Sequence, residues 1–154
     1  MNMLSENFTE FDRAMMKEAL IEAKKSFEAQ EVPVGAVLTL KEKIIARSHN
    51  LVELRKDVTT HAEINVIRQA ASAAGDWRLD QATLYTTLEP CVMCCGAIFL
   101  SRIKRVVWGA KDLRHGGNGS FFNLFLKKHP THPKIEIIGG LYAGESAQLM
   151  KSFF

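Results

Sequence analysis

The spacing of hydrophobic residues near the start of the chain predicts a helix. The residues that repeat every four positions are Phe11, Met15, Ala19, Ala23 and Phe27, and charged residues lie between them. Residues at this spacing share one face of an α-helix. We therefore expect an amphipathic helix that packs its apolar face against the rest of the protein, with a break at Glu31-Val32-Pro33.

Beyond that break, apolar runs alternate between strand and helix patterns. Short runs bounded by turn residues predict strands, whereas longer runs with helical periodicity predict helices. The expected strands cover residues 34–40, 44–48, 82–87, 105–109 and 135–139. The expected helices cover residues 60–74, 91–101, 121–126 and 143–154, and residues 51–57 and 110–120 are expected to be loops.

The connections between these elements predict how the strands pair. The turn at Lys41-Glu42-Lys43 is short enough for a hairpin, so the first two strands should be antiparallel. Helices separate the last three strands, and a right-handed crossover of this kind joins parallel strands. The pattern therefore predicts an α/β chain whose sheet has both kinds of pairing.

Composition limits the class of protein. The chain has 154 residues, 47% of them hydrophobic, and we expect one domain over residues 1–154. The formal charge of 20 minus 17, or +3, permits a polyanionic partner without requiring one. We expect neither a membrane span nor a signal peptide, since apolar stretches are short and the first residues include the acidic Glu6 and Glu10. Three cysteines close together in sequence also fit a reducing compartment, so we expect a cytoplasmic protein.

The cysteines supply the first candidate chemistry. Pro90 suits the first turn of a helix, so Cys91 and Cys94 should share one face of its opening turn. The helix N-terminus favours the thiolate form, which binds metals and attacks disulfides. These two residues alone leave zinc binding and redox chemistry open. Cys95 should point away from the pair and is expected to be a buried structural thiol.

A histidine and a glutamate decide between these two chemistries. His61 opens another predicted helix, and Glu63 follows two positions later. One His and two Cys ligands leave the fourth position of a zinc ion open to water, which indicates a catalytic site. A simpler interpretation of Thr60-x-x-Glu63 is a capping box, in which Glu63 only caps its helix. The joint pattern, H-x-E followed by P-C-x-x-C, is the signature of zinc deaminases.

The chain resembles the bacterial tRNA-specific adenosine deaminases nearly from end to end. The residues that carry the resemblance are 31–37, His61-Ala62-Glu63-Ile64, 88–97, Ser101-Arg102-Ile103 and Phe153-Phe154. The resemblance implies a three-layer cytidine-deaminase-like fold with a mixed five-stranded sheet flanked by helices. It also implies hydrolytic conversion of the wobble adenosine of a tRNA anticodon, typically of an arginine tRNA, to inosine by a homodimer.

Site roles follow from the same resemblance. One Zn(2+) per chain is expected on His61, Cys91 and Cys94, with Glu63 as the catalytic acid and base rather than a ligand. Asn50 would be a plain turn residue by its own pattern, but the family places an Asn at this point in the base pocket. We therefore expect Asn50 to bind substrate.

Basic residues near the glycine-rich loop are candidates for contact with RNA phosphates. They are Lys111, Arg114, Lys127, Lys128 and Lys134. Each alone is an ordinary surface charge, and their grouping is what suggests an RNA-binding surface. The family usually has Ala where this loop has Asn118.

Two other functions fit parts of the sequence. A small-molecule deaminase acting on guanine, cytosine or dCMP can share the same zinc motifs. A non-catalytic zinc-stabilised RNA-binding subunit would need the cysteines but would have no use for Glu63. A homodimer is expected partly because the apolar pairs Phe121-Phe122 and Phe153-Phe154 are hard to bury in one small domain.

Overall fold

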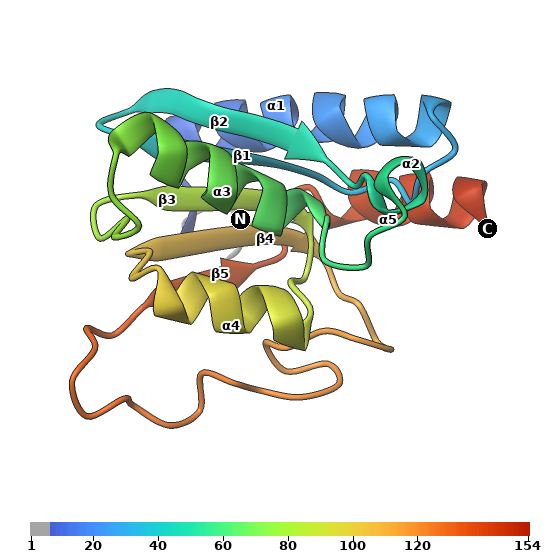
Figure 1. Ribbon diagram of the computed structural model, residues 1–154. Helices are drawn as coiled ribbons and strands as arrows, with labels where there is room; N and C mark the ends of the chain where they lie inside the picture. Colours follow the sequence, from blue (N-terminus) through green and yellow to red (C-terminus); the bar gives the residue numbers. More distant parts are fainter. Residues whose placement is uncertain (1–6) are drawn as a thin grey trace.

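The computed structural model describes residues 7–154 (Figure 1). Glu6, part of the argument against a signal peptide, lies outside the described residues. The helices are α1 (Glu10–Glu28), α2 (Val52–Arg55), α3 (Ala62–Ala74), α4 (Val92–Leu100) and α5 (Ala143–Phe153). The strands are β1 (Gly35–Leu40), β2 (Lys43–His49), β3 (Thr83–Leu88), β4 (Arg105–Ala110) and β5 (Glu136–Gly139). Among the described helices, none combines the length and apolar character needed to cross a bilayer.

The five strands form one mixed sheet in the order β2-β1-β3-β4-β5. Strand β1 pairs antiparallel with β2 and β3, whereas β4 pairs parallel with β3 and β5. The predicted mixed five-stranded sheet is therefore confirmed. The parallel half matters for the site, because α/β sheets place their ligands beyond the carboxyl ends of such strands.

Helices cover both faces of the sheet, which gives three layers (Figure 1). Helices α3 and α4 contribute residues to the apolar core on one face of the sheet. Helix α1 contributes to a second core on the opposite face, and α5 lies on that same side. Successive residues of a strand belong to the two cores alternately. In β3, for example, Leu84 lies in the first core and Tyr85 lies in the second. This alternation follows from the pleat of a strand, which directs neighbouring side chains to opposite faces.

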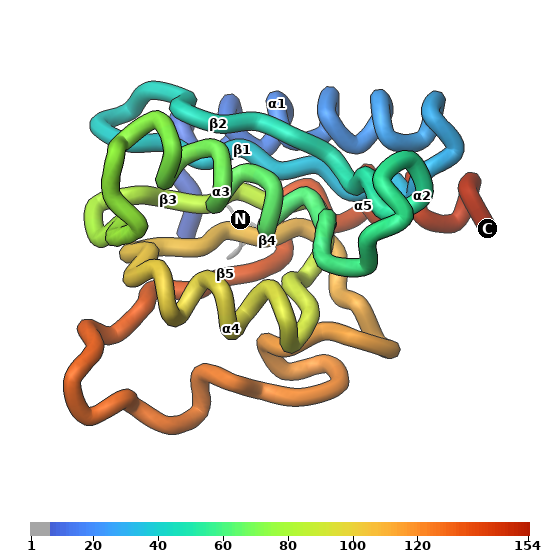
Figure 2. Tube along the Cα trace, viewed as in Figure 1, coloured from blue at the N-terminus to red at the C-terminus, as the bar shows by residue number. Residues whose placement is uncertain are grey.

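The predicted helix over residues 121–126 is wrong, because this segment is irregular. The backbone N–H groups of Phe121 and Phe122 donate to the carbonyl of Gly116, and the N–H of Leu124 donates to that of Gly117. These bonds to the preceding loop replace the bonds of a helix. Strands β4 and β5 are still parallel, as predicted. The connection between them is a long loop that passes the start of α4 (Figure 2).

Two smaller expectations also differ from the structure. The expected loop over residues 51–57 contains the single-turn helix α2, and the Glu31 carboxylate accepts hydrogen bonds from the N–H groups of Glu53 and Leu54, both at 2.8 Å. Pro90 lies just before α4 rather than in its first turn, because Cys91 is the N-cap residue. Cys94 remains in the first turn of that helix.

Candidate metal centre and active site

The candidate ligands meet where two helices begin. His61 is the N-cap residue of α3 and Cys91 is the N-cap residue of α4, with Cys94 one turn later. Both helices start at the same end of the sheet, beyond the carboxyl end of β3 (Figure 1). The fold thus brings His61 together with two cysteines that lie thirty or more positions later in the sequence.

The distances in this cluster fit a zinc ion. The Nδ1 atom of His61 lies 3.6 Å from the Sγ atoms of both Cys91 and Cys94, and all three ligand atoms lie within 4.8 Å of one another. Tetrahedral zinc with ordinary bond lengths holds a nitrogen and a sulfur ligand about 3.6 Å apart. The donor set and its spacing therefore suit zinc.

The three side chains of the cluster differ in how their pKa values are shifted. The hydrogen bond with Cys94, followed by the one with His61, lowers the pKa of the Cys91 thiol to about 4. The bond with Cys91 raises the pKa of His61. The lowered pKa favours the thiolate form of Cys91, which is the form that binds metal.

Glu63 is buried beside this cluster, with 3% of its surface exposed. Burial raises the pKa of its carboxyl group to about 7. Its Oε1 atom has no hydrogen-bond partner among the described residues. The capping-box interpretation is wrong, because His61 rather than Thr60 is the N-cap residue and no side chain caps the helix. The Thr60 hydroxyl instead donates to the carbonyl of Asp57 at 2.7 Å.

Asn50 lies at the end of β2 and is also buried. Its backbone N–H donates to the carbonyl of Val34, which fixes the main chain. Its side-chain Oδ1 is buried without a partner among the described residues. A buried amide oxygen that nothing satisfies is costly, so its presence favours a ligand contact over the role of a plain turn residue.

Asn65 is a residue that the sequence argument missed. Its side-chain amide donates to the carbonyl of His49 at 3.0 Å and to that of Thr60 at 3.2 Å. It therefore ties the segments before Asn50 and before His61 to helix α3. A polar residue one turn after His61, on the buried face of a helix, was the signal in the sequence.

Cys95 takes no part in the cluster. Its Sγ atom donates to the carbonyl of Pro90 at 3.4 Å, and burial raises the pKa of the thiol to about 12. This position agrees with the expectation that Cys95 is a buried structural thiol.

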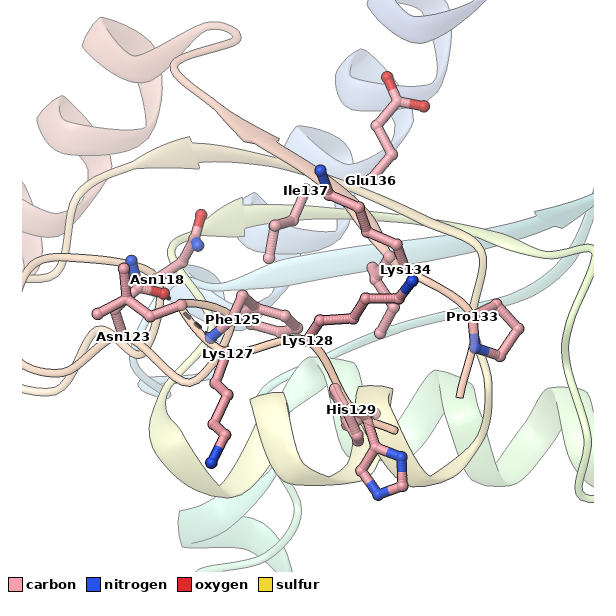
Figure 3. Close-up of a pocket in the computed structure, with 13 residues that line it drawn as sticks. Asn118, Asn123, Phe125, Lys127, Lys128, His129, Pro133, Lys134, Glu136 and Ile137 are labelled. Carbon is pink, nitrogen blue, oxygen red and sulfur yellow. Dashed lines mark hydrogen bonds between the residues drawn. The ribbon is translucent and has the colours of Figure 1, made fainter. Parts of the chain in front are cut away.

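The basic candidates fall into two groups, all exposed. Lys111 and Arg114 lie on the loop that pairs with Cys91 through a β-bridge at Gly116. Lys127, Lys128 and Lys134 instead surround a cavity of about 440 Å³ (Figure 3). None of the three cluster residues lines this cavity, whose walls include Phe99 of α4 and Ile137 of β5.

Comparison with known proteins first gives the class. Residues 10–153 match the family model described as MafB19-like deaminase. A solved structure of a guanine deaminase from Bacillus subtilis has a TM-score of 0.62 and 28% identity, covering 80% of this chain and 88% of that one. The chain is therefore of the deaminase class.

Closer relatives define the family within that class. The chain is 47% identical to the tRNA-specific adenosine deaminase of Bacillus subtilis, covering 93% of this chain and 88% of that protein. It is 46% identical to the chloroplastic tRNA(adenine(34)) deaminase of Arabidopsis thaliana, covering 93% of this chain but only 12% of that longer protein. A structure from a study of A-to-I editing by tRNA:A34 deaminases has a TM-score of 0.84 and 45% identity, covering 88% of this chain and 98% of that one. The chain belongs to the family of tRNA-specific adenosine deaminases.

Proposed function

We propose that the protein converts adenosine to inosine at the wobble position of a tRNA anticodon. The observation that carries this proposal is the buried carboxylate of Glu63, whose Oε1 has no partner among the described residues, beside the cluster of His61, Cys91 and Cys94. The names and identities of the relatives supply the substrate class. A structural zinc site would have no use for such a carboxylate, so the non-catalytic alternative is disfavoured.

The reaction replaces the exocyclic amine of the base by oxygen, with water consumed and ammonia released. His61, Cys91 and Cys94 would hold one zinc ion per chain, and zinc in such a site supplies the activation of water. Glu63 would take one proton from the attacking water and deliver it to the ring nitrogen. It would then take the second water proton, from the hydroxyl now on the ring carbon, and pass it to the departing amine, so that the C=O bond forms as the C–N bond breaks. Burial of this carboxyl group raises its pKa from the usual value, which favours uptake of a proton during the reaction.

Asn50 would orient the base through its side-chain amide. The buried Oδ1 can accept a hydrogen bond from a ring or ribose donor, and the fixed backbone holds this atom in place. The exposed basic residues on the two loops would contact phosphates of the anticodon arm.

The remaining parts of the proposal concern partners and location. An arginine tRNA is the proposed substrate, and a homodimer is the proposed assembly, with neighbouring subunits shaping the RNA groove. The cytoplasm is the proposed compartment, because free cysteines fit a reducing environment.

The deciding experiment compares RNA with free bases. The zinc-loaded protein should form inosine in an anticodon stem-loop with adenosine at the wobble position and should leave a matched loop with guanosine there unchanged. Guanine, cytosine and dCMP serve as the small-molecule arm. Turnover of one of these molecules without turnover of the stem-loop would overturn the proposed function in favour of a small-molecule deaminase.

A further inference from the structure

The carboxylate of Glu89 is buried, with 1% of its surface exposed, and all its described hydrogen-bond partners lie on one loop. It accepts from the backbone N–H of Asp112 at 3.2 Å, of Asn118 at 2.9 Å and of Ser120 at 3.2 Å. The hydroxyl of Ser120 also donates to it. Three N–H groups and one hydroxyl can satisfy a buried carboxylate without a neighbouring cation.

The loop over residues 111–120 closes tightly around this carboxylate. A Cβ atom at Gly116 would lie 2.3 Å from the carboxylate of Glu89, so only glycine fits there. The side chain of Asn118 is fixed in addition, because its Oδ1 accepts a hydrogen bond from the indole N–H of Trp108 at 2.9 Å. The loop therefore has one defined conformation set by buried contacts.

The same loop is joined to the candidate metal centre. The N–H of Gly117 donates to the carbonyl of Pro90 at 2.8 Å, and Gly116 forms a β-bridge with Cys91. The loop also carries the exposed side chains of Lys111 and Arg114. Glu89 thus lies between a metal ligand two residues away and a loop with two basic residues.

We propose that Glu89 is a positioning residue, which holds the loop over residues 111–120 beside the metal centre so that Lys111 and Arg114 meet the RNA backbone. This inference rests on the proposed function. Glu89 would act on RNA binding through the loop. It would affect neither metal binding nor proton transfer.

The variant Glu89→Gln tests the hydrogen bonds of the carboxylate alone, because glutamine has nearly the same size as glutamate. One carboxylate oxygen faces the N–H of Asp112, and the other faces the N–H groups of Asn118 and Ser120. In either orientation, the NH₂ group of glutamine would therefore oppose at least one backbone N–H. The loop should loosen while the rest of the fold is kept.

The first measurement is independent of activity. Hydrogen exchange of peptides covering residues 111–120 should become faster in Glu89→Gln, while zinc content stays at one per chain. The matched control is Asp12→Asn, another buried carboxylate, whose partners Tyr85 and Arg105 lie far along the sheet from the loop. Asp12→Asn should lower thermal stability without faster exchange in the loop. Unchanged exchange in Glu89→Gln would overturn the proposal.

The second measurement separates positioning from a purely structural role. In Glu89→Gln, KM for the stem-loop should rise about tenfold, with kcat within about threefold of wild type. The double variant Lys111→Ala/Arg114→Ala should raise KM similarly, and adding Glu89→Gln to it should have little further effect. A fall in kcat alone, loss of zinc or fully additive effects would each contradict the proposed role. A wild-type protein inactive on the stem-loop would refute the proposed function instead, and the exchange result would still report on the loop.

Discussion

The buried carboxylates of this protein differ in the groups that surround them. Asp12 accepts two hydrogen bonds from the guanidinium of Arg105, at 2.7 and 2.9 Å, and Glu31 accepts two from backbone N–H groups. Glu63 instead keeps one oxygen without a described partner, and its pKa is raised by burial. At the residue scale, the number of hydrogen-bond donors therefore separates Asp12 and Glu31 from Glu63, the carboxylate for which we propose a catalytic role.

Replacement of Glu63 tests its proposed role. Glu63→Ala should retain zinc and bind the stem-loop normally, while kcat falls by at least about 10²-fold because proton transfer is lost. Zinc analysis, a binding titration and single-turnover inosine formation measure the three properties. Thr60→Ala is the control, and it should stay active. Turnover near wild type in Glu63→Ala would mean that the carboxylate has no chemical role.

Asp12 gives a prediction about acid stability. Burial raises the pKa of its carboxyl group, but hydrogen bonds from Arg105, the Thr9 N–H and the Tyr85 hydroxyl outweigh this, so the pKa lies below the usual 3.8. The unfolded chain therefore binds this proton at a higher pH than the native protein does, and stability rises with pH in that range. The contribution is complete above pH 3.8 and is lost as the pH falls through the native pKa.

The measurement is urea unfolding at several pH values. Wild type should lose stability steeply below about pH 4, whereas Asp12→Asn should show a weaker dependence there and a stability lower by about 3 kcal/mol at neutral pH. Parallel curves for the two proteins would contradict the assignment.

At the element scale, the site depends on two helices that start side by side. Helices α3 and α4 pack against each other and the same face of the sheet, so their first residues converge beyond β3. Adjacent residues on a helix point in different directions, which separates Cys94 from Cys95. Position within the helix, and not residue type, therefore decides which of the two cysteines joins His61 and Cys91 in the cluster.

This separation predicts different effects for two thiols. Cys91→Ala should lose zinc and show a lower Tm, because metal binding would stabilise the junction of the two helices. Cys95→Ala should keep one zinc per chain, with a modest loss of stability from the small cavity. Metal analysis and thermal melts distinguish the two cases. Full zinc in Cys91→Ala would overturn the ligand set.

The connection from β4 to β5 carries the prediction for RNA binding. Charge reversal at Lys127 and Lys128 together should weaken stem-loop binding regardless of sequence and reduce its salt dependence, because fewer counterions are released. Zinc content should not change. Asn50→Ala should behave differently and lower the rate at saturating RNA, since it would misplace the reacting base.

Binding titrations at several salt concentrations, with rates at saturating RNA, separate these two effects. If both variants lose only affinity, with the same salt dependence, then Asn50 does not contact the base. Unchanged binding in the double charge reversal would mean that Lys127 and Lys128 do not contact the RNA.

For the whole molecule, the apolar residues that stay exposed are informative. The exposed fractions of Phe121, Phe122 and Phe154 are 67%, 54% and 84%. Phe153, in contrast, packs edge-on against Phe27, with 6.2 Å between the ring centroids. The three exposed phenylalanines are thus left in water in the single chain, and large exposed apolar side chains of this kind can be covered by another protein.

We therefore expect a homodimer at micromolar concentration. Sedimentation velocity should give a mass twice that of the 17.3 kDa chain. Phe122→Ser should shift the protein towards monomer and lower its activity if neighbouring subunits shape the groove. A fully active wild-type monomer would refute the expectation.

The sequence determined what depends on local spacing. The four-residue repeat from Phe11 to Phe27 was enough for α1, because a helix follows from side chains near one another in sequence. The Cys91-x-x-Cys94 pattern and His61 were enough to predict the cluster, because few chemistries need these residues at this spacing. Most of the ends of these strands and helices moved, but each by only one or two residues.

Tertiary structure decided everything that depends on distant partners. The segment from Phe121 to Leu126 has a helix-like composition, yet its backbone bonds to Gly116 and Gly117 instead. The role of Glu89 was invisible for the same reason, since its donors lie 23 to 31 residues further along the chain. Hydrogen-bond donors and acceptors are present in every residue, so sequence alone does not say which pair will meet. The fold makes that choice when the start of α4 and the loop after β4 come together.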